Sequence, residues 1–290
     1  MSDSHNKIMN DLRRLLESQN FKSEEDMRKF ADSLIGEPIP SFPSDVLTDK
    51  EKAEDLVDEA YDLPSKKARE NIDKALALDA DCIPAYEFLA ETNPNPPAVK
   101  VFLEKGITIG RRLFGGEYTR LNLGHFWGLI ETRPFMRCMQ SYADLIFFEG
   151  NIKGCSDILE ELVTLNPNDN QGARDLLLLC LIDLDEKGKF RTYEKFYHED
   201  SSSFALFNRA LFAFKTNGAG ENTNKKLKKA LDHNHFVARK LTSKGAVNQL
   251  PHAYQIGSIE EADYYVHFAR PIWHKTFGSL AWLKKNAGII

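Results

Sequence analysis

The sequence predicts an all-α fold made of stacked helix pairs, and three observations lead to this prediction. Large and small apolar residues recur at a period of about 34 residues, which is the length of a two-helix repeat. Helical stripes and capping residues lie on both sides of the periodic region. The 290 residues, with 42% hydrophobic and 28% charged side chains, can bury a core without disulfides or metals.

Residues 1–44 are expected to form an N-terminal helical segment and a proline-rich linker. The first helix is predicted from apolar residues that share one helix face, and the second begins at Ser23 with acidic residues in its first turn. Gly36 to Ser44 contains three prolines, which end the second helix. The two apolar faces consist of Ile8, Leu12, Leu15 and Leu16, and of Met27, Phe30, Ala31 and Leu34.

Residues 45–290 are expected to hold the repeats, and the clearest repeat ends at Pro167. Small residues between large ones let its two helices approach closely, and a glycine marks the turn between them. The matching residues are Met139, Ala143, Ile146, Gly150, Cys155, Leu159 and Leu162. This spacing is the tetratricopeptide pattern, so the sequence predicts a tetratricopeptide-like α-solenoid.

Three further repeats fit the same pattern. Two follow without a gap, over 170–203 and 204–237, and an earlier one is separated from the clearest unit by an insertion around 91–133. The matching residues are Ala173, Tyr193 and Phe196 in the first, Phe207, Phe214, Gly218, Leu227 and Ala230 in the second, and Ala68, Ile72 and Ala75 in the earlier unit.

The C-terminal region is expected to add two helices. Ser258 and Glu261 form a capping box for a helix that runs to about Ala269, where Pro271 bends or stops it. An aromatic-rich closing helix then caps the end of the stack. Its apolar residues are Trp273, Phe277, Leu280, Trp282 and Leu283.

Two unusual stretches of sequence carry a family resemblance. They are Gly124 to Gly128 together with Glu131 to Arg137, and Leu165 to Gly172. On these residues the chain resembles bacterial tetratricopeptide proteins related to the eukaryotic suppressor-of-tumorigenicity-seven family, from Phe21 to Leu283. The resemblance implies a helical-repeat fold and a cytoplasmic bacterial protein, and it implies no established activity. The chain departs from the family pattern at Leu121, Asp175 and Phe277.

The first helices of stacked pairs line a concave groove, which makes their inward positions candidate contacts for a partner. The candidates are Arg137, Gln140, Asp144, Gln171, Arg174, Asn208 and Lys215, beside the aromatic Phe147 and Phe212. Such a surface suits an extended acidic peptide or a C-terminal carboxylate. We therefore expect a protein–protein interaction scaffold. A competing interpretation is that one of the chain's own terminal helices fills the groove.

A second hypothesis places a small-ligand pocket or an active site around residues 125–137. An arginine there could grip a carboxylate or phosphate while an aromatic ring walls the pocket. The candidates are His125, Trp127, Glu131 and Arg133. The structural alternative is a junction in which the aromatic residues fill the core, because aromatic stripes usually serve packing.

A third hypothesis concerns a basic patch over residues 225–244. Residues 221–244 hold 7 basic and 2 acidic side chains, whereas residues 1–70 hold 11 basic and 17 acidic ones. Lys225, Lys226, Lys228 and Lys229 are expected on the exposed face of a helix whose inward face is Leu227 and Ala230. Association with RNA or the ribosome through this patch is an alternative function. The net charge of −5 and the lack of interleaved aromatic residues favour a protein partner over a nucleic acid.

Several classes of protein are not indicated by the sequence. The four cysteines are too dispersed for a zinc or redox motif and are expected to be buried thiols. No phosphate-binding loop, dinucleotide fingerprint, metalloprotease motif or nucleophile elbow is present, so we expect no cofactor or metal and no enzyme of those classes. The polar start lacks a secretory signal and no apolar run is long enough to span a membrane, so the protein is expected to be cytoplasmic.

Overall fold

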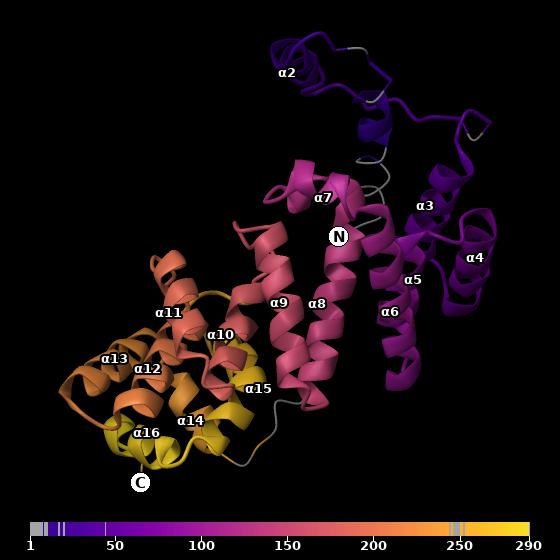
Figure 1. Cartoon of the computed structure of the whole chain (residues 1–290). Coiled ribbons are helices and arrows are strands. Elements are labelled where there is room, and N and C mark those ends of the chain that lie inside the picture. The colour runs from indigo at the N-terminus through magenta and orange to yellow at the C-terminus, as the bar shows by residue number, and fades with distance from the viewer. Residues whose placement is uncertain are drawn as a thin grey trace. The chain divides into compact units, whose positions relative to one another are not determined.

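The protein folds into α-helices that pack against their neighbours (Figure 1), as the sequence predicted for the fold class. The computed structural model describes residues 8, 11–16, 18, 19, 21–43, 45–243, 245, 250, 251 and 253–289. Within these ranges no residue belongs to a β-strand. In the same part of the chain, every helix is too short or too polar to cross a membrane.

The helices follow one another along the described part of the chain. Residues 11–16 are helical, and α2 to α16 and the two short 3-10 helices η1 and η2 follow in order. Their bounds are α2 Glu24–Ser33, α3 Asp49–Ala60, α4 Ser65–Leu78, α5 Ile83–Thr92, α6 Pro96–Leu113, α7 Glu117–Asn122, η1 Phe126–Gly128, η2 Ile130–Thr132, α8 Arg133–Phe148, α9 Ile152–Leu165, α10 Ala173–Asp183, α11 Lys187–Phe196, α12 Ser203–Asn217, α13 Glu221–His233, α14 Phe236–Thr242, α15 Ile259–Lys275 and α16 Ser279–Ala287.

The chain divides into two compact units. Unit 1 comprises residues 1–121 and 129–138, and unit 2 comprises residues 122–128 and 139–290. The predicted N-terminal segment 1–44 belongs to unit 1. Residues 122–128 thus belong to unit 2 and residues 129–138 to unit 1. Most of these residues lie within the insertion that the sequence predicted around 91–133.

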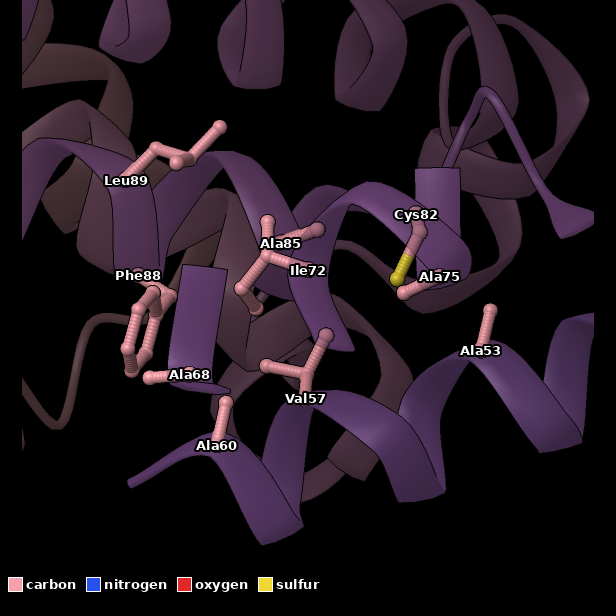
Figure 2. Close-up of a cluster of buried hydrophobic side chains, with 10 residues drawn as sticks. All are labelled: Ala53, Val57, Ala60, Ala68, Ile72, Ala75, Cys82, Ala85, Phe88 and Leu89. Carbon is pink, nitrogen blue, oxygen red and sulfur yellow. The ribbon is translucent and has the colours of Figure 1, made fainter. Parts of the chain in front are cut away.

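Small residues bring α3 and α4 together in unit 1. Figure 2 shows alanines from both helices, with Val57 and Ile72, in one buried cluster that α5 completes. Alanine side chains allow a close helix–helix approach, and the branched residues fill the remaining space. The predicted stripe of Ala68, Ile72 and Ala75 indeed lies on the buried face of α4.

The second helix predicted in the N-terminal segment is present as α2, but its predicted apolar face is not buried. Ser23 caps α2 by accepting a hydrogen bond from the Asp26 backbone at 3.1 Å. Met27 is nevertheless exposed, and no residue described between 18 and 46 is buried. Ser44, at the end of the predicted linker, lies outside the described residues.

Unit 2 contains the clearest predicted repeat. Met139, Ala143, Cys155 and Leu159 are all fully buried, on α8 and α9. Gly150 ends α8 with a φ of +84°, a left-handed conformation that glycine adopts without steric cost. The alternation of large and small residues therefore marked the inward faces of both helices.

The repeat predicted over 170–203 differs from the prediction in its second helix. Ala173 is buried, but Phe196 is 62% exposed at the end of α11. The aromatic residue that α11 buries is Phe190, whose ring stacks on Phe212 of α12 at a centroid distance of 3.9 Å. Phe212, expected in the groove, thus packs between consecutive helix pairs.

The C-terminal helices also differ from the expectation. α15 continues through Pro271 to Lys275, because Ala269, Ile272 and Trp273 are buried on both sides of the exposed proline. Trp273 therefore belongs to α15, and Phe277 is 99% exposed in the turn that follows. α16 contacts α12, α13 and α14, and its Trp282 stacks on Phe214 at 4.5 Å.

A glycine substitution tests the close approach of α6 to the start of α8 in unit 1. A β-carbon on Gly110 would overlap the ring of Phe135. We expect Gly110→Ala to lower the free energy of unfolding by about 1–3 kcal/mol, measured by urea denaturation. Gly188→Ala in α11 is the matched control, because a β-carbon at that position would meet no atom within 4 Å. Equal stability of the two variants would contradict the described packing.

Candidate binding site

In unit 2, α15 packs against first helices that were expected to line the groove. This helix contacts both α10 and α12, and Figure 1 shows it beside α10. The Tyr265 ring packs edge-on against Phe204 at a centroid distance of 5.2 Å, and the Phe268 ring lies 6.2 Å from Phe147. In unit 2, the chain's own penultimate helix thus packs against part of the surface on which a partner was expected.

A buried carboxylate fixes the start of α15. Glu261 accepts hydrogen bonds from the Ser203 backbone at 2.8 Å, the Ser203 hydroxyl at 2.7 Å and the Gly257 backbone at 2.7 Å. Asn234 donates a further bond at 3.1 Å. Burial alone would raise the pKa of Glu261, but these donors outweigh it and hold the pKa below its usual value. The ionised carboxylate thereby joins α15 to α12.

Arg174 links the starts of α10 and α12. Its guanidinium donates to Asp169 and to Asp200, each at 2.9 Å, and lies 5.3 Å from the ring centroid of Tyr197. Asp169 also accepts a hydrogen bond from the Ala173 backbone at the start of α10, at 2.8 Å. Burial disfavours the charged form of Arg174. The carboxylates of Asp175, Asp200 and Asp169 favour that form more strongly, so they raise the pKa of Arg174 above its ordinary value.

The remaining groove positions of α12 face α10. Lys215 donates to the carbonyl oxygens of Ile182 and Asp183, where a cation offsets the negative end of the helix. Asn208 is fully buried and donates to the Asp175 carbonyl at 3.3 Å. Gln171, in the turn before α10, is partly exposed. These groups serve the packing of neighbouring helices.

Asp144 is a predicted groove residue on α8, and burial shifts the pKa of its carboxyl group. Gln140 donates to it at 3.1 Å. Burial raises the pKa of Asp144 to about 7, because the single amide donor offsets little of the lost hydration. An ionised Asp144 therefore destabilises the fold.

Arg137, the remaining predicted groove residue, belongs to unit 1. Its guanidinium forms a two-pronged ion pair with Glu87, with the Nη2–Oε2 distance at 2.7 Å. Glu87 is buried, so the pair neutralises a carboxylate of α5. The three cations expected to bind an acidic tail, Arg137, Arg174 and Lys215, thus all have partners within the chain.

The residues of the hypothetical pocket are divided between the two units. His125 and Trp127 belong to unit 2, where His125 is exposed and Trp127 partly exposed. Glu131 and Arg133 belong to unit 1, where Glu131 accepts a hydrogen bond from the Tyr118 hydroxyl at 3.0 Å. The stretch forms the separate turns η1 and η2, so the ligand hypothesis for these residues stays a prediction.

Unit 2 contains a cleft of about 690 Å³, lined by α13, the start of α14 and the end of α16; we call it the α13–α16 cleft. Its side chains combine basic groups, two acids and an apolar floor. The lining residues are Glu221, Asn224, Lys225, Lys228, Leu231, Asp232, His235, Ala238, Arg239, Asn286, Ala287 and Ile289. Part of the predicted basic patch therefore borders a concave surface.

Charge in the α13–α16 cleft is only partly balanced. Lys228 pairs with Asp232 at 2.5 Å. Across the described ranges, Lys225 and Arg239 form no ion pair, and both are exposed. The cleft also needs residues of α16 that no sequence pattern singled out, since their contribution depends on how α16 packs against α13 and α14.

Comparison with models of protein families, with curated proteins and with solved structures found no match to this chain.

Replacing Asp144 tests the effect of its burial. Its folded pKa of about 7 lies above the value of 3.8 expected when unfolded, so its stabilising contribution is present below pH 4 and is lost as the pH rises through 7. We expect Asp144→Asn to be about 2 kcal/mol more stable than the wild type at pH 8 and similar to it at pH 4. Thermal unfolding at both pH values measures this, with the exposed Asp157→Asn as control.

Replacing Glu261 tests the attachment of α15. Glu261→Ala leaves the backbone and hydroxyl donors of Ser203 buried without their acceptor, so we expect a loss of about 3 kcal/mol in urea unfolding. The exposed neighbour Glu260→Ala should cost less than about 0.5 kcal/mol. Similar losses for the two variants would show that the buried carboxylate does not hold α15 in place.

Proposed function

We propose that the protein is a cytoplasmic binding scaffold of the tetratricopeptide type, and that it holds the anionic C-terminal segment of another protein in the α13–α16 cleft. The observation that carries this proposal is the position of Lys225 and Arg239 on the border of that cleft. The repeated helix pairing and the family resemblance support the scaffold class, and the partner's charge follows from the cleft.

The α13–α16 cleft suits a peptide end in both size and chemistry. Small-ligand sites commonly measure about 300–1,000 Å³ and combine apolar walls with a few polar groups. Leu231, Ala238 and Ala287 offer contacts for a terminal apolar side chain. Lys225 and Arg239 offer charged donors for a carboxylate, and charge-assisted hydrogen bonds of this kind are the stronger ones.

The same observations favour the α13–α16 cleft over the groove that the sequence predicted. The carboxylate of a bound peptide must compete with any acceptor of the chain that already pairs with the same lysine or arginine. Arg174 and Lys215 already donate to carboxylates or carbonyls of the chain, and α15 packs against their helices. The Lys225 and Arg239 side chains have no such competitor among the ion pairs of the described residues.

RNA association through the basic patch is the second candidate, because Lys225 and Lys229 are exposed on α13. Glu221 and Asp232 border the same cleft, however, and their charges oppose a polyanionic backbone. A short segment with one terminal charge meets less of this repulsion. The geometry therefore favours the peptide.

Binding of defined peptides tests the proposal. The probes are fluorescein-labelled hexapeptides that carry two glutamates before an apolar last residue, each made as the free acid and as the amide. We expect the full-length protein to bind the free acids at least about tenfold more tightly, since amidation removes the terminal charge. Fluorescence anisotropy measures both affinities.

Charge reversal locates the site. Lys225→Glu/Arg239→Glu should lose most of the peptide affinity, whereas Lys284→Glu/Lys285→Glu should retain it, because the latter lysines are exposed but do not line the cleft. Equal loss in both variants, or no preference for the free acid, would contradict the peptide proposal. Tighter binding of a uridine oligonucleotide, steeply dependent on salt, would instead favour the RNA alternative.

A further inference from the structure

Two cysteines that are separated in the sequence meet in the core of unit 2. Cys155 lies in the first turn of α9 and Cys180 in the last turn of α10, and these two helices pack against each other. The two Sγ atoms are 3.6 Å apart, and both side chains are fully buried. All four cysteines belong to the described part of the chain, and these are the two whose sulfur atoms contact each other.

The arrangement of this pair allows a bond between the sulfur atoms. A disulfide holds its sulfur atoms about 2.05 Å apart, so the two thiols must approach by about 1.5 Å. Rotation of a cysteine side chain between staggered positions moves its sulfur by more than this distance. Cys155 also occupies a small-residue position of the clearest repeat, where the two helices come close together. The packing that buries the thiols therefore places them where they can be joined.

The two thiols differ in how they hold their protons. The Cys180 thiol donates a hydrogen bond to the Cys155 sulfur, and this bond together with burial raises the pKa of Cys180 well above its usual value. The thiolate, and not the thiol, is the form of cysteine that attacks an oxidant. Because Cys180 keeps its proton, the attacking sulfur is that of Cys155, and Cys180 is the thiol that completes the bond.

We propose that Cys155 and Cys180 form an oxidative modification site, at which hydrogen peroxide converts the two thiols into a disulfide. The Cys155 thiolate attacks one peroxide oxygen, the O–O bond breaks, and the hydroxide that leaves takes up the Cys155 proton as water. The Cys180 sulfur then attacks the sulfenic acid sulfur, and the displaced hydroxyl group leaves with the Cys180 proton as a second water. Two thiols and one peroxide thus give one disulfide and two waters.

The disulfide would link the start of α9 to the end of α10. The two cysteines are 25 positions apart, and a cross-link over such a loop stabilises a fold mainly by constraining the unfolded chain. α10 also packs against α12 and α15, so the bond would hold a helix that contacts both of them. Because the thiols are buried, oxidation follows a local opening of the helix pair. This site is separate from the α13–α16 cleft and stands whether or not the proposed function holds.

Peroxide treatment of the folded full-length chain tests the proposal without any variant. After catalase has removed the peroxide, the chain is unfolded with iodoacetamide, digested without reductant and analysed by mass spectrometry. We expect a Cys155–Cys180 peptide pair that lacks two hydrogen atoms, about tenfold more abundant than any other cysteine pair. Cys82 and Cys138, which are also buried, should be recovered as alkylated thiols. The same oxidation in urea is the control, because the unfolded chain has no fixed pairing and should form several cysteine pairs.

Thermal unfolding provides a second readout. Oxidation should raise the melting temperature of the wild type by about 5–10 °C, and dithiothreitol should reverse this rise. Cys155→Ala should show no such rise, whereas Cys82→Ala in unit 1 should retain it. Failure of the folded wild type to form the cross-link, or equal amounts of all cysteine pairs, would overturn the proposal.

Discussion

Donors from three segments of unit 2 converge on the Glu261 carboxylate. Ser203 begins α12, Asn234 ends α13, and Gly257 precedes α15, so one buried group ties two helix starts to a helix end. An ionised carboxylate without such donors costs several kcal/mol to bury. Any shift of α15 along α10 and α12 would break these bonds, which is why this helix has one register.

The position of α15 has consequences for the charged residues around it. α15 packs against α10 and α12, and the cations at groove positions bind the ends of α10: Arg174 at its start, and Lys215 at its last carbonyl oxygens. Their side chains donate to acceptors within the chain. In the proposed function, recognition of an anion depends instead on Lys225 and Arg239, which border the α13–α16 cleft.

The sequence predicted well those features that depend on neighbours along the chain. The small residues Ala143 and Cys155 must be buried for α8 and α9 to approach, and the 34-residue spacing was enough to select them. The exposure of Phe196 and Phe277 could not be predicted, because it depends on which distant helix covers each position. The covering of Asn208 by neighbouring helices was missed for the same reason.

The grouping of charged residues at the candidate sites could likewise not be predicted from neighbours along the chain. A lysine-rich helix was evident in the sequence, but a cleft required the end of α16, which comes much later in the chain, to pack beside α13. Likewise, Glu51 caps α3 together with Thr48 and also lies 3.2 Å from Arg14. The cap and the buried face of Ala53 and Val57 hold α3 in place without the arginine. The pairing of Arg14 with Glu51 and Asp55 depends on a segment that comes earlier in the chain, so the pattern of α3 alone could not predict it.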